Sequence, residues 1–216
     1  MDSGPARPEP AGHTGRLTRA AWVAAARAVL VRRGIGALGV RSLAAEMHVT
    51  PGAFYWQFRN LAALHDDLRH DWADSNTTPF SRAIDAAGPD GLRQYLAWVR
   101  VLVMEDEFDP GYDNAIRDWA HHAPRTAAVL AEVEALRIRQ LRGIFGAMGF
   151  EGHAAEIRAR VAYYHQVGFN AMRVHETREQ RLRNVPYYAE ILTDSRALAG
   201  LDSADAVLRA LNGGSF

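Results

Sequence analysis

Two short helical segments joined by a tight turn span residues 39–58, and this feature constrains the fold more than any other. In the first segment, Val40–Met47, apolar residues recur at offsets of three, four and seven, as on one face of a helix. Thr50 and Pro51 then mark a helix start, because threonine is a good N-cap and proline fits the first helical position. The second segment ends near Gln57. This spacing predicts a helix-turn-helix, whose second helix lies in the DNA major groove.

The residues of this motif divide into an inward and an outward set. The apolar residues expected to fix the angle between the two helices are Leu43, Ala44, Val49, Phe54 and Phe58. The residues expected on the outside are Thr50, Pro51, Gly52, Ala53, Tyr55 and Trp56. An exposed Tyr-Trp pair is costly on an idle surface and indicates a partner. From the pattern alone, a buried aromatic plug in a plain helical bundle is the alternative.

Charge is divided unevenly along a chain whose net charge is zero. Residues 1–60 carry eight arginines and three acidic residues, a net charge of +5, and the remainder carries −5. A basic head favours DNA as a partner, because neutralised phosphates supply most of the non-specific affinity.

Helical periodicity continues through the rest of the chain, and no alternating run is long enough for a strand. We predict an all-α protein with nine or ten helices. One helix ends at Gly34 and another follows Asn60. Five prolines are expected between or at the starts of helical segments: Pro79, Pro89, Pro110, Pro124 and Pro186. The remaining helices are expected near residues 90–107, 112–120, 124–148, 153–175, 186–199 and 203–211.

We expect three parts: a disordered tail (1–15), a DNA-binding head (16–76) and a helical body (77–216). The tail holds three prolines and three glycines and has no apolar period. It lacks the apolar region of a signal peptide, and no run approaches the length of a membrane span. Cysteine is absent. We therefore expect a cytoplasmic protein without membrane contact, thiolate metal site or cofactor.

Residues 49–60 read Val-Thr-Pro-Gly-Ala-Phe-Tyr-Trp-Gln-Phe-Arg-Asn, and this stretch resembles the signature of the tetracycline-repressor (TetR) family. The similarity extends over about residues 16–64. It implies a three-helix DNA-binding head, a divergent ligand-binding body, and a homodimer released from operator DNA by a small-molecule effector. By position, residues 50–53 would face base edges and residues 55–57 would face phosphate and sugar. The DNA-binding set implied is Arg16, Thr18, Arg41, Thr50, Pro51, Gly52, Ala53, Tyr55, Trp56, Gln57, Arg59 and Asn60.

Three positions depart from the family pattern. His48 stands where glycine is usual in the turn, and histidine tolerates the left-handed conformation less well than glycine. Gln57 replaces a common histidine but can still donate to phosphate. Leu61 replaces a lysine that contacts phosphate in the family, and Arg59 is a candidate to supply that charge. These changes affect individual contacts and leave the motif intact.

The body carries no motif, so its sites rest on composition and on the resemblance. Aromatic and polar residues of the middle helices are the candidate effector site: Trp98, Met104, Phe108, Trp119, Tyr163, Tyr164, His165 and Asn170. Simple core packing is the alternative for each. The segment near 153–175 is apolar almost all round, which indicates burial on several sides. The resemblance places the dimer interface there and in the next helix, on Ile157, Val161, Gly168, Ala171, Met172, Tyr188 and Ile191.

An enzyme or metal sensor is the competing class of function. Asp118, His121, His122 and His165 are the residue types of an imidazole-carboxylate metal site. His121 and His122 are adjacent, however, and point about 100° apart on a helix. We therefore expect no metal site and no catalytic residue. A helical adaptor that binds only protein is disfavoured by the basic head.

Overall fold

The computed structural model describes residues 18–214, which form ten α-helices, one short 3-10 helix and no strand. The head contains α1 (Arg19–Arg33), η1 (Ile35–Ala37), α2 (Val40–Glu46) and α3 (Gly52–Tyr55). The other helices are α4 (Leu61–Ala86), α5 (Gly91–Met104), α6 (Pro110–Ala120), α7 (Pro124–Ala147), α8 (Gly152–Ala171), α9 (Arg178–Thr193) and α10 (Ala204–Leu211). The predicted all-α class and helix number are confirmed. The expected disordered tail and Arg16 lie outside the described residues.

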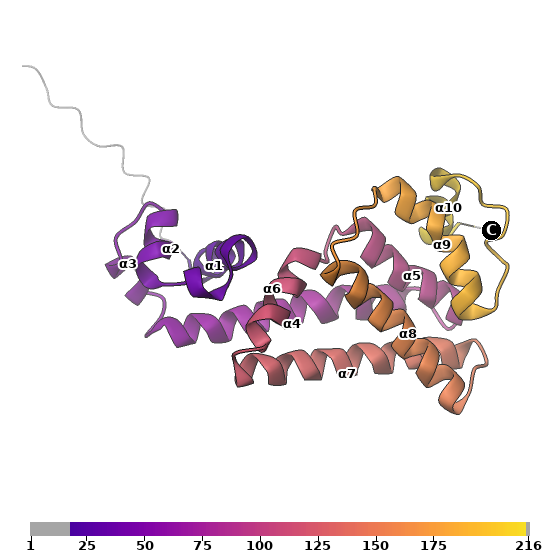
Figure 1. Ribbon diagram of the computed structural model, residues 1–216, viewed down its shortest axis with the longest axis horizontal. Coiled ribbons are helices and arrows are strands. Elements are labelled where there is room, and N and C mark those ends of the chain that lie inside the picture. Colours follow the sequence, from indigo (N-terminus) through magenta and orange to yellow (C-terminus); the bar gives the residue numbers. More distant parts are fainter. Residues whose placement is uncertain (1–17, 215–216) are drawn as a thin grey trace, which may run out of the picture.

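Helix α4 forms the spine of the molecule. Its 26 residues span about 39 Å, with α1, α2 and α3 at its N-terminal end and α5, α9 and α10 towards the other (Figure 1). Helix α7 packs alongside α4, and α8 packs on α7. The expected boundary between residues 76 and 77 falls inside α4, so the head and the body share one continuous helix.

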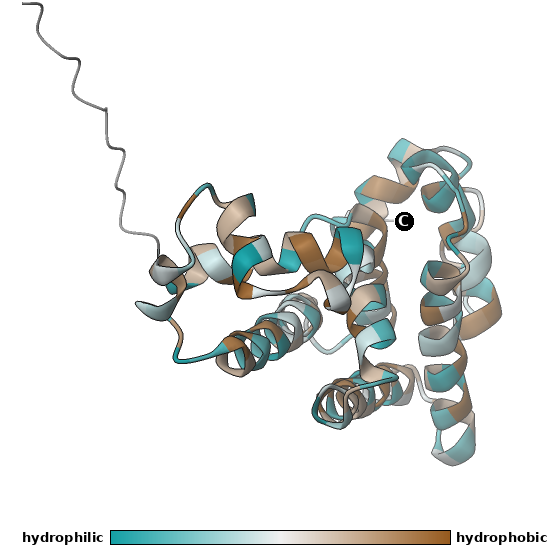
Figure 2. Cartoon of the chain, turned by 60° about the vertical axis from the view of Figure 1, so that its left-hand side comes forward, coloured by the Kyte–Doolittle hydropathy of each residue, from teal (hydrophilic) through white to brown (hydrophobic). Residues whose placement is uncertain are grey.

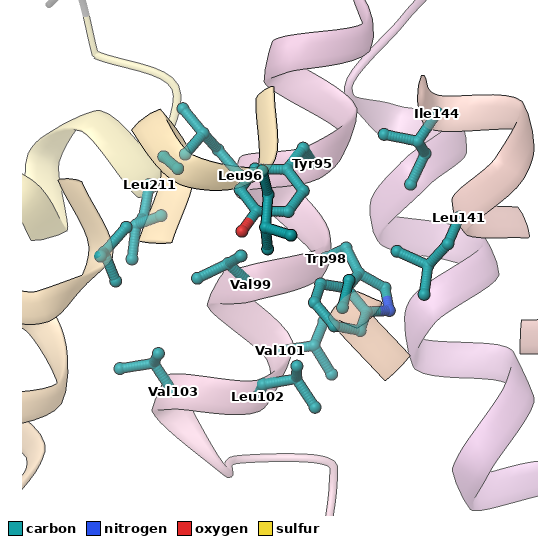
Figure 3. Close-up of a cluster of buried hydrophobic side chains, with 14 of the residues drawn as sticks. Tyr95, Leu96, Trp98, Val99, Val101, Leu102, Val103, Leu141, Ile144 and Leu211 are labelled. Atoms are coloured by element: carbon teal, nitrogen blue, oxygen red, sulfur yellow. The ribbon is translucent and has the colours of Figure 1, made fainter. Parts of the chain in front are cut away.

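Two hydrophobic cores lie along this spine, and brown and teal residues alternate along the helices around them (Figure 2). The head core includes Trp22, Phe54 and Leu68, and it extends to Tyr112 and Trp119 of α6. The body core is built mainly on α5, α7, α8, α9 and α10. Figure 3 shows its centre, where the side chains of α5 meet residues of α7 and α10. Helix α6 therefore packs against the head as well as the body.

Two prolines expected at helix boundaries lie inside helices instead. Pro79 is buried within α4, and Pro186 is buried within α9. An interior proline removes one backbone hydrogen bond and costs a helix roughly 3 kcal/mol. Burial of the surrounding residues offsets this cost; Phe80, for example, is fully buried in the body core. We expected a helix break at Pro79 and a helix start at Pro186 because proline locally disfavours a helix interior. Tertiary packing outweighs this local preference at both positions.

Other helix ends differ by a few residues from those expected. Helix α9 begins at Arg178, because the preceding Thr177 caps it: Thr177 Oγ1 accepts from the Gln180 amide at 3.2 Å. Gln180 Oε1 in turn accepts from the Thr177 amide at 2.8 Å, which completes a capping box. The Thr-x-x-Gln spacing was a readable signal for this start. Helix α8 ends at Ala171 rather than near His175, and α5 ends at Met104.

The contact between α5 and the end of α7 leaves no room for a side chain at Gly91. A Cβ there would lie 2.8 Å from the Ile144 carbonyl oxygen and 2.8 Å from the Met148 amide nitrogen. Backbone atoms cannot move aside cheaply, so Gly91→Ala should destabilise the protein by about 1–3 kcal/mol. Urea unfolding followed by circular dichroism measures this change.

Gly143→Ala is the matched control, because Gly143 lies in α7 with no neighbouring atom within 4 Å of a built Cβ. Alanine is the better helix former by up to about 1 kcal/mol, so this variant should unfold at equal or higher urea. Equal stability of the two variants would show that α5 and α7 do not pack as described.

Candidate nucleic-acid interface

The turn between α2 and α3 is closed by short-range backbone hydrogen bonds. The Val49 amide donates to the Ala44 carbonyl at 2.9 Å. His48 takes a φ of +56°, the left-handed conformation in which histidine is tolerated better than most residues. The expectation that His48 occupies the usual glycine position is confirmed. The turn lets α3 leave at an angle to α2, as a helix-turn-helix requires.

Phe54 anchors α3 to the rest of the head. It is fully buried, and its ring meets Trp22 of α1 edge-on with centroids 5.4 Å apart. It also stacks on Phe58 at 5.2 Å. The predicted inward residues are all buried, or half-buried against this core in the case of Val49: Leu43, Ala44, Val49, Phe54 and Phe58. Because one side of α3 is held in this way, the other side must face solvent.

The outer side of α3 is the most open apolar surface of the head. Trp56 is 87% exposed and Tyr55 is 61% exposed, so neither forms the buried plug considered as the alternative. Thr50, Pro51 and Gly52 are exposed as expected. Ala53 differs, because it is half-buried and packs against the head core. Gln57 is also half-buried.

Two arginines of the head have no partner within the described part of the chain. Arg41, in the first turn of α2, and Arg59, just after α3, are exposed and make no hydrogen bond or ion pair within residues 18–214. Their guanidinium groups are available for bidentate contacts with phosphate. Two other residues of the predicted DNA-binding set already act as N-caps. Thr18 Oγ1 accepts from the Ala21 amide, and Asn60 Oδ1 accepts from the Ala63 amide.

Leu61 starts α4 and is half-buried against the head core. The position where the family resemblance would place a phosphate-binding lysine is therefore used here for packing. Arg59, two residues earlier, is the nearest free cation in sequence.

A cluster of polar contacts between α1, α4 and the start of α6 connects the head to the body. Arg27 of α1 pairs with Asp109 at 2.9 Å, and its guanidinium lies 4.5 Å from the centre of the Tyr112 ring. The Tyr112 hydroxyl donates to the Leu68 carbonyl of α4 at 2.8 Å. Burial raises the pKa of Tyr112 above its usual range, so the hydroxyl stays a donor. Helices α1, α4 and α6 therefore meet at one point, and a shift of α6 would reach the head directly.

An apolar cavity of about 70 Å³ lies between α5, α8 and α9. Two of the predicted effector-site residues line it, Trp98 and His165. Val99 and Leu102 of α5, labelled in Figure 3, line it as well. The His165 ring lies 4.6 Å from that of Tyr188, and burial lowers the pKa of His165, which favours its neutral form. Tyr188, which we expected at the dimer interface, also lines this cavity.

A second, open cleft of about 900 Å³ lies between the end of α1, α6 and the segment joining α8 to α9. Trp119 and Asn170 of the predicted effector site line this cleft rather than the apolar cavity. Asn170 is buried, and its Nδ2 has no hydrogen-bond partner within residues 18–214. Three residues line both spaces: Phe169, Glu176 and Arg181. The two spaces are therefore neighbours with walls of different polarity.

Four predicted effector-site residues line neither space. Phe108 packs edge-on against Phe80 in the body core, and Met104 is half-buried at the end of α5. Tyr164 is 57% exposed. Tyr163 is buried in a polar network, where its hydroxyl accepts from Arg117 at 2.8 Å. The structure thus does not bring the predicted set together in one site.

The network around Arg117 ties α6 to α7 and α8. Arg117 pairs with Asp113 at 2.8 Å and with Glu134 at 2.6 Å. Burial raises the pKa of Tyr163 to about 12, so this residue is neutral at physiological pH. Arg137 is buried nearby, where it donates to the Asn76 carbonyl and lies over the Phe80 ring. The network is internal and holds α6 in place.

Exposed apolar residues lie on both α8 and α9, and we refer to them together as the α8–α9 surface. Within α8, small residues and Tyr163 face the core, whereas Ile157, Val161 and Tyr164 face solvent. The expectation that α8 is buried on several sides is therefore wrong for the isolated chain. The exposed apolar residues of this surface are Ile157, Val161, Tyr164, Met172, Tyr187, Tyr188 and Ile191. Gly168 is half-buried and Ala171 exposed; Tyr187 is an addition to the predicted set.

The residues considered for a metal site are also dispersed. Asp118, His121 and His122 line the open cleft, whereas His165 lines the apolar cavity. Across residues 18–214, no group of three or more histidine, cysteine or acidic side chains is placed to hold a metal ion. Within the same range, no helix is long and apolar enough to cross a membrane.

Comparison with known proteins matches the head to one family. Residues 23–68 match the model of the bacterial regulatory proteins of the tetR family, which covers most of α1, all of α2 and α3, and the start of α4. No curated protein matches the chain. The matched segment carries the open α3 surface together with Arg41 and Arg59, and the match supports a DNA-binding transcriptional regulator. The helix-turn-helix head of this chain is therefore similar to that of the bacterial regulatory proteins of the tetR family.

Proposed function

We propose that the protein is a homodimeric repressor that a small-molecule effector releases from a pseudo-palindromic operator. The observation that carries this proposal is the exposed surface of α3, where Tyr55 and Trp56 stand in solvent. The same head carries the exposed Arg41 and Arg59, which have no partner within residues 18–214. A mobility-shift assay with the promoter DNA next to the protein's own gene tests it. If no shift is seen at low salt, the protein does not bind this DNA, and the proposed repression of its gene is refuted as well.

The proposed contacts divide into base readout and backbone positioning. Thr50, Pro51 and Gly52 are exposed at the start of α3 and are small enough for the backbone to approach base edges. Tyr55 and Trp56, one turn later, would contact phosphate and sugar. Arg41 and Arg59 add charge to the same side. Contacts to phosphate hold the register on DNA, whereas contacts to base edges specify sequence.

The exposed apolar residues of the α8–α9 surface support a dimer. Met172 is 77% exposed and Ile191 is 71% exposed, and contiguous apolar patches of this kind mark interaction sites. A second copy of the chain is the occupant we propose, because a two-fold dimer presents two heads to one DNA duplex. The half-site centres would then lie about 34–36 Å apart, or a multiple of that distance.

The effector is proposed to enter the apolar cavity between α5, α8 and α9. Ligand sites usually have volumes of roughly 300–1000 Å³, much more than the cavity of about 70 Å³ seen here. An effector must therefore widen the cavity and shift its walls. The neighbouring open cleft, which shares Phe169 and Arg181 with the cavity, suits the polar end of an amphipathic molecule. A change from 1:99 to 99:1 between two states needs about 10⁴-fold tighter binding to the favoured one.

Arg41→Ala should weaken DNA binding without unfolding the head, because Arg41 is exposed and holds no partner in the described chain. The loss should affect operator and random DNA alike. The slope of log K against log salt should fall by about 0.9 per lost phosphate contact, or roughly 1.8 for a dimer. Fluorescence anisotropy titrations at several salt concentrations measure both quantities.

Arg139→Ala provides the control, since Arg139 is an exposed residue of α7 that likewise has no partner among residues 18–214. It removes the same charge from the body and should leave the salt slope unchanged. If the two variants behave alike, Arg41 does not touch the DNA backbone.

Tyr55→Ala should weaken operator binding while the melting temperature stays within a few degrees of the native value. Tyr55 is mostly exposed, and surface substitutions usually change stability by less than about 0.5 kcal/mol. Thermal unfolding and the operator titration are measured on the same sample. A head that melts before it loses DNA would show that Tyr55 supports the core.

Ile191→Asp should convert the dimer into monomers, because it puts a charge in the centre of a buried apolar contact. Light scattering at micromolar concentration gives the mass directly. Ala131→Asp, at an exposed position of α7, adds the same charge elsewhere and should leave the dimer intact. A native chain that is already monomeric at this concentration would contradict the proposed dimer.

A further inference from the structure

One arginine connects three parts of the head, and the sequence pattern did not single it out. Arg19 is the first residue of α1. Its Nε and Nη2 donate to the two carboxylate oxygens of Asp67 in α4, at 2.5 and 2.8 Å. Its Nη1 donates to the Gln57 carbonyl, just beyond α3, at 2.8 Å. The guanidinium also lies 4.3 Å from the centre of the Phe58 ring.

This placement is unfavourable for α1 taken alone. The N-terminus of a helix carries partial positive charge, so a cation in the first turn is disfavoured there. The first turn of α1 holds no acidic residue to compensate. The bidentate contact with Asp67 supplies the compensation from another helix. The position of Arg19 therefore makes sense through its tertiary contacts rather than through helix formation.

The contact with Gln57 bears on the DNA-binding surface. Carbonyl groups at the end of a helix lack partners within that helix, and α3 is only four residues long. The arginine satisfies the carbonyl of Gln57 directly after Tyr55 and Trp56. It thereby fixes the backbone from which these two exposed side chains project.

We propose that Arg19, held by Asp67, is a positioning residue that clamps the end of α3 to α4 in the geometry that DNA requires. This proposal rests on the DNA-binding role of the head. The side chain of Arg19 is half exposed and that of Asp67 is one-quarter exposed, so the pair adds little to overall stability. Its effect is to keep a very short recognition helix in one orientation relative to the helix that continues into the body.

A direct phosphate contact by Arg19 is the competing role, and Asp67→Asn separates the two. This change removes a negative charge from the head and releases the guanidinium. If Arg19 were a phosphate ligand, operator binding would tighten. If Arg19 is a clamp, binding weakens by about threefold per head, or roughly tenfold per dimer, the range expected from an exposed bidentate pair.

Asp74→Asn is the matched control for charge. Asp74 lies two turns further along α4, is exposed, and has no partner within residues 18–214. It changes the net charge by the same amount and should leave binding unchanged or slightly tighter. An operator duplex selected from a random pool by the native protein is the probe, titrated with each variant at one salt concentration. Asp67→Asn binding as tightly as Asp74→Asn, or tighter, would overturn the clamp.

Arg19→Lys tests the geometry while keeping the charge. Lysine lacks the planar fork that contacts both oxygens of a carboxylate and a carbonyl together, so the clamp predicts weakened binding, whereas a phosphate contact would survive. Hydrogen exchange on the free protein gives a readout without DNA. The amides of Gln57 and Phe58, which donate to the Phe54 carbonyl, should exchange faster in both variants while those within α1 do not. Unchanged exchange at these two amides would also refute the clamp, whether or not the protein binds DNA.

Discussion

The structure depends on the continuity of α4 between the head and the body. Leu64, Leu68 and Trp72 of this helix lie in the head core, and Phe80 lies in the body core. A single helix cannot change its orientation at one end without changing it at the other. The recognition helix is therefore placed by contacts made far along the chain. The buried Pro79 lies in α4 between the residues of the head core and Phe80 of the body core. Helix α4 is continuous through this position, although proline normally interrupts a helix.

Helix α6 provides the second connection between the two ends. It contributes Tyr112 and Trp119 to the head core, and Arg117 ties it to α7 and α8. Trp119 also meets His65 of α4, with ring centroids 5.1 Å apart. Burial lowers the pKa of His65, so this contact is made by the neutral ring. Both α4 and α6 must keep their places for the head to keep its orientation.

The sequence was enough to predict features that depend on neighbouring residues. Periodicity gave the all-α class, the inward set around Phe54 and the exposure of Tyr55 and Trp56. These follow from local order, because facing on a helix is set by spacing alone. Interiors of helices were harder: Pro79 and Pro186 are breaks by local rules, and only tertiary burial shows that the helices continue. Helix α9 was misplaced for this reason, although its Thr-x-x-Gln start was visible.

Features that depend on distant residues could not be read from one sequence. Arg19 and Asp67 are 48 positions apart, and nothing in either segment indicates that they pair. The predicted effector residues are of similar type, but they do not lie together: Trp98 lines the cavity and Trp119 lines the cleft. Aromatic character does not report beside which helix a side chain will lie. Burial and exposure within the contiguous helix-turn-helix were therefore predicted better than the grouping of residues from α5, α8 and α9.

The position of the cavity has a consequence for how the proposed effector and DNA would influence each other. The cavity walls are α5, α8 and α9, and α5 packs on α4 as well as on α7. An effector that widens the cavity would therefore act on the spine that positions the recognition helix. Coupling of this kind is reciprocal, because the factor by which effector weakens DNA binding equals the factor by which DNA weakens effector binding. Operator binding would then favour the narrow form of the cavity over the widened one.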